Sequence, residues 1–251
     1  MARSVQKLQT PQRTVVQTKT LAALEAAIPQ CQACPRLRVY CQSVAQTKVK
    51  RYISDEYWGR PVPGFGDRAA RILVVGLAPA AHGANRTGRV FTGDRSGDFL
   101  YAALYRAGLA SQPHSVSRDD GLTLHGAYVS AAARCAPPDN RPTPDELATC
   151  RAFLHKELRL LPKLRVVIAL GAIGHQAVLR ALRDPDQPTE AKLPKFAHGQ
   201  KSLLTLDATH TLWLLDCYHV SQQNTFTGRL TPSMLDDVLR QAKVLADLDA
   251  R

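Results

Sequence analysis

One stretch decides the fold: "RILVVGLAPAAHGANRTGRVFTGD", residues 71–94. It begins with the short apolar run of a buried strand, and a loop rich in small residues follows. The loop lacks the lysine and the hydroxyl of G-x-x-x-x-G-K-[ST], and it does not match G-x-G-x-x-G. The two common loops for nucleotide phosphates are therefore excluded, and we expect this loop to hold a different ligand.

Predicted strands and helices alternate from residue 71 onward. We expect strands at 71–77, 126–133, 165–171 and 210–219, and helices at 96–109, 143–161, 172–182 and 231–248. The helix at 143–161 has a clear start, because Thr143 can cap it, Pro144 suits its first position and Glu146 completes a capping box. Four such βα repeats predict an α/β fold with a parallel sheet covered by helices on both faces.

The part of the chain before residue 71 has weaker signals. Residues 1–17 are polar and without periodicity, so we expect a disordered basic tail there and a folded domain over 18–251. Residues 20–28 have helical apolar spacing, and residues 36–70 are interpreted as a basic, aromatic connector.

Three suggestive loops follow the predicted strands, at 76–94, 134–141 and 219–229. Ligands of open α/β sheets bind outside the carboxyl ends of the strands. The topology therefore predicts that these loops meet in one cleft.

The chain carries 33 basic and 21 acidic residues, a formal charge of +12. A surplus of this size favours an anionic partner, most commonly nucleic acid, although the acid-free residues 1–20 account for part of it. No apolar run reaches the roughly 18 residues of a membrane span. Residues 1–10 also lack the apolar core of a signal peptide, so we expect a cytoplasmic protein that does not bind membranes.

The six cysteines form a candidate set: Cys31, Cys34, Cys41, Cys135, Cys150 and Cys217. The first two make a C-x-x-C pair, which occurs in redox motifs, zinc sites and iron–sulfur sites. A redox pair normally opens a helix after a strand, whereas Cys31 follows a predicted helix. Spacing alone leaves Cys150 as either a ligand or a core residue. We interpret Cys41 and Cys217 as non-ligands, and we expect no disulfides without a secretion signal.

Five separated motifs give the sequence a family resemblance: "CQACPRL", "RPVPGFGD", "GLAPAAHGANRTGRVFTGD", "ARCAPPDNRPTPDEL" and "YHVSQQNTFTGRLT". In this order and spacing they resemble the uracil-DNA glycosylase superfamily, within it the iron–sulfur-containing branch called family 5 or type B. The resemblance runs from about residue 26 to the end. It implies a single-domain three-layer sandwich with a central four-stranded parallel sheet.

The resemblance also implies an activity and a cofactor. The expected enzyme is a monomeric, monofunctional hydrolase that removes uracil from damaged, mainly double-stranded DNA in base-excision repair, at the nucleoid of a bacterium or archaeon. The alternatives are a non-catalytic, metal-stapled DNA-binding module and a nucleotide-binding α/β enzyme. A [4Fe–4S] cluster would be held by Cys31, Cys34, Cys135 and Cys150, and zinc on the same thiolates is the alternative.

By the same resemblance, the loop at 76–94 cradles a base flipped out of DNA. The small residues Gly76, Ala78 and Ala80 would let backbone groups approach the base. Phe91 would stack on it; its alternative role is core packing. Other branches place an acid or amide in the loop that corresponds to "GLAPA", whereas this chain has none there. The nearest acid, Asp94, is therefore our candidate catalytic carboxylate, and its alternative role is to cap the next helix.

The remaining candidates support the same reaction. His219 matches the histidine of the superfamily's second motif and would stabilise the departing base. Weaker candidates are His82 and Asn85, which could position a water, and Asn224, which could hydrogen-bond the base or a phosphate. The residues expected to contact DNA are Gln222, Gln223 and Arg229. Related enzymes carry an asparagine where Ala131 stands, so we expect relaxed base selection that includes hypoxanthine and xanthine.

Overall fold

The computed structural model describes residues 11, 15, 17–183, 193–206 and 210–248. Most of the predicted tail at 1–17 lies outside these residues, so its disorder stays a prediction. The described residues form a mixed six-stranded sheet in the order β1-β3-β2-β4-β6-β5. Its strands are β1 (Phe65–Gly66), β2 (Ile72–Gly76), β3 (Ala127–Ala131), β4 (Val166–Leu170), β5 (Lys201–Thr205) and β6 (Thr211–Cys217).

The four predicted strands are the four central ones, and they pair in parallel: β3 with β2, β2 with β4, and β4 with β6. The prediction of a four-stranded sheet was incomplete, because β1 and β5 add antiparallel edges. Strand β1 has only two residues, and β5 exposes every second side chain. Neither edge therefore carries the apolar run by which buried strands are recognised.

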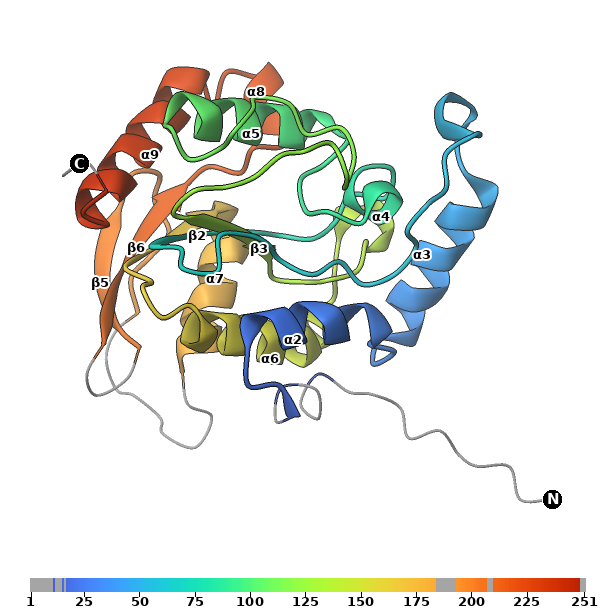
Figure 1. The fold of residues 1–251 in the computed structure, drawn as a ribbon, viewed down its shortest axis with the longest axis horizontal. Helices are drawn as coiled ribbons and strands as arrows, with labels where there is room; N and C mark the ends of the chain where they lie inside the picture. Colours follow the sequence, from blue (N-terminus) through green and yellow to red (C-terminus); the bar gives the residue numbers. More distant parts are fainter. Residues whose placement is uncertain (1–10, 12–14, 16, 184–192, 207–209, 249–251) are drawn as a thin grey trace.

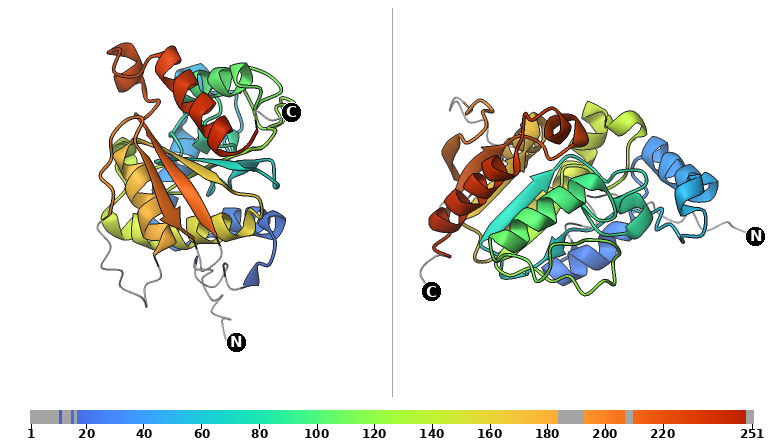
Figure 2. Two further views of the ribbon diagram at one scale, coloured as in Figure 1. Left: turned by 90° about the vertical axis from the view of Figure 1, so that its left-hand side faces the viewer. Right: turned by 90° about the horizontal axis from the view of Figure 1, so that it is seen from above.

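Helices cover both faces of the sheet, as Figures 1 and 2 show. One face packs against α5 (Arg95–Arg106) and α9 (Pro232–Leu245) through the core that contains Ile72 and Val74. The other face packs against α2 (Leu21–Ala27), α6 (Pro144–Leu160) and α7 (Gly171–Leu182) through the core that contains Leu73 and Val75. The alternation along β2 follows from the two-residue period of a strand.

The predicted start of α6 is confirmed in detail. The Thr143 side chain accepts from the Glu146 backbone N–H at 3.2 Å, and Glu146 Oε2 accepts from the Thr143 backbone N–H at 2.8 Å. This reciprocal capping box fixes the first turn of the helix directly after the loop at 134–141.

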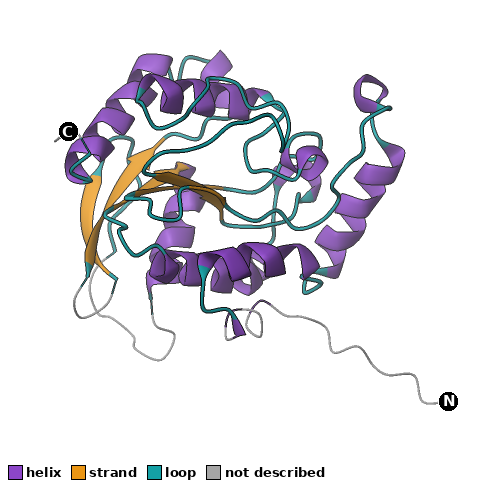
Figure 3. Cartoon of the chain, viewed as in Figure 1, coloured by secondary structure: helices purple, strands orange, loops and turns teal. Residues whose placement is uncertain are grey.

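The connector interpretation of residues 36–70 was wrong over its first third, because α3 (Pro35–Thr47) is a helix. It stands at one side of the molecule, and mostly loops separate it from the sheet (Figures 1 and 3). Five short helical segments of the described chain also went unpredicted: η1 (Ile28–Gln30), η2 (Lys50–Tyr52), α4 (Ala84–Thr87), η3 (Pro138–Asn140) and α8 (Gln222–Phe226). No helix in the described part of the chain is long and apolar enough to span a bilayer.

Candidate active site

A cavity of about 640 Å³ opens at the carboxyl ends of the parallel strands. Residues that follow each of the four central strands line it: 77–96 after β2, 139–141 after β3, 170–173 around the end of β4, and 219–224 after β6. The three predicted loops therefore meet in one place. The fourth segment, residues 170–173, was not predicted from the sequence. Its only signal was Gly171 at the end of the strand, which has φ +81° in the structure.

Asp94 is placed for both of its candidate roles, as a carboxylate in the cavity and as the cap of α5. Its side chain caps α5 by accepting from the Gly97 backbone N–H at 2.9 Å, and it also lines the cavity. Gly83 makes room for it, since a Cβ there would overlap Asp94 Oδ2. Burial raises the pKa of Asp94 above its ordinary value, and the backbone N–H groups of Gly97 and Ser96 oppose this shift. The carboxylate is thus held in place and poorly solvated, which suits a base.

Phe91 lines the cavity and is held in a strained conformation. Its φ is +50°, and its ring packs on Gly76, where a Cβ would overlap it. Five described non-glycine residues have positive φ, and three of them, Phe91, Asp139 and Asn140, line this cavity. Such strain costs roughly 1–3 kcal/mol per residue and is concentrated at functional sites.

His219 also lines the cavity, beside Phe91, with 6.4 Å between the ring centroids and 40° between the ring planes. Burial lowers the pKa of His219 to about 4, so the ring is neutral at pH 7. Asn224 donates from Nδ2 to the backbone oxygen of His219 at 2.8 Å. The predicted role of Asn224 therefore changes in part, because its amide N–H supports the loop that carries His219.

The other predicted residues divide into two groups. Ala78, Ala80, Gln222 and Gln223 line the cavity, whereas Gly76, His82, Asn85 and Arg229 do not. His82 Nδ1 lies 3.0 Å from the Tyr57 hydroxyl. Asn85 is fully buried and donates to the backbone oxygens of Cys41 and Ala81 at 3.3 Å each. The structure therefore corrects the placement of His82 and Asn85 in the base site. Arg229 lies over the Tyr218 ring, 4.8 Å from its centroid.

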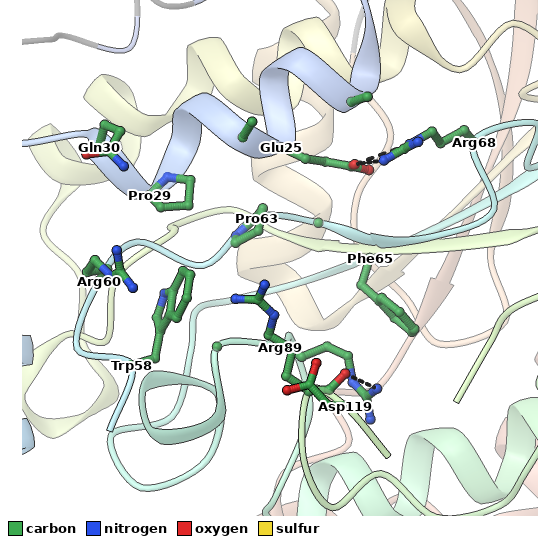
Figure 4. Close-up of a pocket in the computed structure, with 15 residues that line it drawn as sticks. Glu25, Pro29, Gln30, Trp58, Arg60, Pro63, Phe65, Arg68, Arg89 and Asp119 are labelled. Atoms are coloured by element: carbon green, nitrogen blue, oxygen red, sulfur yellow. Dashed lines mark hydrogen bonds and ion pairs between the residues drawn. The ribbon is translucent and has the colours of Figure 1, made fainter. Parts of the chain in front are cut away.

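A second cavity, of about 540 Å³, lies at the β1 edge of the sheet beside α2 (Figure 4). Two of its arginines are already paired: Arg68 with Glu25 at 2.6 Å and Arg89 with Asp120 at 2.7 Å. Arg60 lies over the Trp58 ring, 4.1 Å from its centroid. None of the predicted site residues lines this cavity, so we do not assign the reaction to it.

The four candidate ligand cysteines border one small cavity of about 20 Å³. Cys31 and Cys34 lie just before α3, Cys135 follows β3, and Cys150 lies on α6. Burial raises the pKa of Cys34 to about 11 and that of Cys150 to about 12. The two remaining cysteines lie outside the lining: Cys41 is buried on α3 beside Cys135, and Cys217 is buried in β6.

The lining of this cysteine cavity suits an anionic, sulfur-ligated group. Two buried arginines, Arg38 and Arg134, border it together with the thiols. Nε and Nη1 of Arg134 have no hydrogen-bond partner among the described residues. No three Cys, His, Asp or Glu side chains of those residues are arranged to hold a single metal ion. The thiols border a space instead, and four cysteines are the usual ligand set of an iron–sulfur cluster.

The cysteine cavity is coupled to the rim of the 640 Å³ cavity by the loop at 134–141. Cys135 begins this loop, and Asp139, Asn140 and Arg141 reach the rim. Arg36 on α3 binds Glu146 through two contacts of 2.8 Å and donates to the Arg141 backbone oxygen at 3.2 Å. A group that binds the four thiols would therefore help to fix one wall of the larger cavity.

Comparisons with known proteins show which proteins this chain is similar to. The family model described as "Uracil DNA glycosylase superfamily" matches residues 63–243. The Type-5 uracil-DNA glycosylase of Mycobacterium tuberculosis is 50% identical over 231 residues, which cover 92% of this chain and 83% of that protein. That of Thermus thermophilus is 50% identical over 228 residues, covering 90% and 98%. That of Pyrobaculum aerophilum is 46% identical over 212 residues, covering 84% and 87%.

Proposed function

The chain belongs to the uracil DNA glycosylase superfamily, and we propose that the cavity of about 640 Å³ at the carboxyl ends of its strands is the pocket for a flipped base. The enzyme is a hydrolase that cleaves the N-glycosidic bond of uracil in DNA as part of DNA repair. One observation carries the pocket assignment: loops from four strands bring Phe91, Asp94 and His219 to a single cavity. A base must leave the stack before its bond to the sugar can be reached.

The proposed reaction is a hydrolysis at C1′ of the deoxyribose. The bond between C1′ and the base nitrogen breaks with its electron pair on the base, and a water oxygen bonds to C1′. Asp94 stabilises the positive charge on the sugar and accepts the proton of the water. His219, neutral at pH 7, donates an N–H to the base as negative charge develops on it. The base leaves as its anion and takes a proton from solvent, Asp94 returns its proton to solvent, and the products are the free base and an abasic site.

The pH profile of kcat/KM is expected to show no break at 6.5, the ordinary pKa of histidine. Burial has already lowered the pKa of His219 to about 4, so this ring stays neutral as the pH falls through 6.5. Burial raises the pKa of Asp94, so its protonation forms the acid limb, above the ordinary aspartate value. Excision rates between about pH 4 and pH 8 test this. An acid limb at 6.5 that disappears in His219→Asn would contradict it.

We infer that the DNA duplex lies across α8, beside the mouth of the base pocket. Gln222 and Gln223 are exposed at this mouth, and Arg229 is exposed just beyond the helix. Phe226, at the end of α8, has 70% of its surface exposed although it is a large apolar side chain. Apolar side chains that enter a duplex fill the gap between unstacked bases. Phe226 is therefore our candidate for the space that the flipped base leaves.

We infer a base range wider than uracil, because β3 ends in Ala131 and offers no side-chain amide for bidentate recognition. Duplex oligonucleotides that contain uracil, hypoxanthine or xanthine, followed by alkali, test both the activity and its range. We expect alkali-labile sites with all three bases and none with an undamaged duplex. Cleavage with uracil alone would refute the wide range, and cleavage with none of them would leave only a DNA-binding module.

We propose that the cysteine cavity holds a [4Fe–4S] cluster, through Cys31, Cys34, Cys135 and Cys150. The cluster, when bound, supplies a cross-link between the start of α3, the loop at 134–141 and α6. The proposal is supported by the sulfur donor set and by the two buried arginines that border the same cavity. Iron and acid-labile sulfide in the purified protein test it, and zinc without iron is the contradicting result.

A further inference from the structure

We propose that Arg38 and Arg134 are positioning residues for the cluster: their buried positive charges retain it and raise its reduction potential. This inference rests on the [4Fe–4S] proposal. Both arginines border the cavity that the four cysteines line, and the two residues are 5% and 1% exposed. They come from different segments, α3 and the loop at 134–141, so the fold brings two cations to one small cavity.

Arg38 has no carboxylate partner in the part of the chain that the structure describes. Nη1 and Nη2 both donate to the backbone oxygen of Gly59 at 3.1 Å, and Nε donates to Gln32 Oε1 at 3.4 Å. These neutral acceptors satisfy the N–H groups but do not compensate the charge. An uncompensated buried charge is expensive, so a negative group is expected beside it.

Arg134 has a carboxylate partner but keeps spare donors. Its Nη2 pairs with Glu157 Oε2, which also accepts from the Ser130 hydroxyl at 2.7 Å. Nε and Nη1 remain without a partner among the described residues. A buried donor without an acceptor costs about 1–3 kcal/mol. The backbone N–H of Arg134 lies 3.3 Å from Cys150 Sγ, so this residue already borders one of the proposed ligands.

A cluster with four thiolates accounts for both observations. Its net negative charge would compensate Arg38, and its sulfur atoms would accept the free N–H groups of Arg134. Charge and hydrogen bonds around the sulfurs set the reduction potential of such clusters. A nearby cation stabilises the more reduced state, so its loss lowers the potential. Groups behind the ligands also affect retention, typically 10–100-fold in affinity.

The experiment measures the midpoint potential of the cluster and the rate of its loss to a chelator, in the purified holoprotein. Arg38→Met is expected to lower the potential and to speed cluster loss about tenfold. Arg38→Lys keeps the charge and is expected to stay near the wild-type potential. Lys50→Gln is the control, because it removes an exposed cation that follows the same helix and lies outside the cavity lining.

Arg134 needs a paired variant, because removing it alone would leave Glu157 as a buried, unpartnered carboxylate. Arg134→Met with Glu157→Gln removes both charges and the spare donors of the guanidinium. We expect faster cluster loss than in wild type, whereas Glu157→Gln alone keeps the donors and retains the cluster better than the double variant.

The iron and sulfide content of the wild-type protein tests the cluster assignment separately from the role of the two arginines. If the wild-type protein holds zinc or no metal, the cluster assignment itself is wrong. If the cluster is present and Arg38→Met matches Lys50→Gln in potential and in loss rate, the role of the buried cation is refuted. A potential that falls in Arg38→Met and recovers in Arg38→Lys supports that role. Lysine restores the positive charge but not the packing of arginine, so the recovery would come from the charge.

Discussion

Asp94→Asn is expected to lower the single-turnover rate of uracil excision by about 10²–10⁴-fold, the usual contribution of a positioned acid or base. An amide can neither accept the proton of the water nor stabilise the sugar cation as a charge. Asparagine caps helices about as well as aspartate, so α5 should keep its start. DNA affinity should be retained, because the substitution removes a negative charge. Single-turnover rates at saturating enzyme measure the loss of excision, and a separate titration with uracil-containing DNA measures the affinity.

Asp98→Asn is the matched control for this prediction. Asp98 lies in the first turn of the same helix, is exposed and does not line the cavity. It should keep an excision rate close to that of wild type. Equal rates for the two variants, or loss of DNA binding in Asp94→Asn, would remove Asp94 from the proposed chemistry.

Cys135→Ala is expected to have the second large effect, the loss of bound iron together with most of the excision activity. Cys135 borders the cysteine cavity and begins the loop whose other end forms the rim of the base pocket. Binding of a structural metal group contributes directly to folding stability. Even about 3 kcal/mol of lost stability would lower the melting temperature by roughly 6–12 °C in a chain of this size. Iron analysis, thermal unfolding and excision rates measure the three effects.

Cys41→Ala serves as the control for the cysteine substitution. Cys41 is buried beside Cys135 and donates to the backbone oxygen of Ala136 at 3.5 Å, but it does not line the cavity. It should keep its iron. Retention of iron and sulfide by Cys135→Ala, or their equal loss from Cys41→Ala, would contradict the ligand set.

The central sheet and its loops were predictable because they depend on short-range pattern and topology. Each central strand is an apolar run, and parallel strands bring the loops at their carboxyl ends together. Phe91, Asp94 and His219 therefore could be placed in one cleft from sequence. Edge strand β5 could not, because every second residue in it is exposed.

The errors in the site come from long-range packing that the sequence does not display. Helix α3 buries four of its 13 residues, one of them an arginine, while Val39 on the same helix is 66% exposed, so its apolar residues do not coincide with its buried face. Without α3, nothing indicated that Cys41 would accept a hydrogen bond from the Asn85 amide. Similarly, the pairing of His82 with Tyr57 joins two segments that the sequence separates by 25 residues.

A crystal structure of Asp94→Asn with a duplex that contains one uracil tests the central claim most directly. We expect the uracil outside the helix, in the cavity that Phe91 and His219 line, with Phe226 in the gap that the base leaves. We also expect the C1′ carbon to face residue 94. A uracil that stays stacked in the duplex, or that occupies the second cavity at the β1 edge of the sheet, would contradict the proposed base pocket.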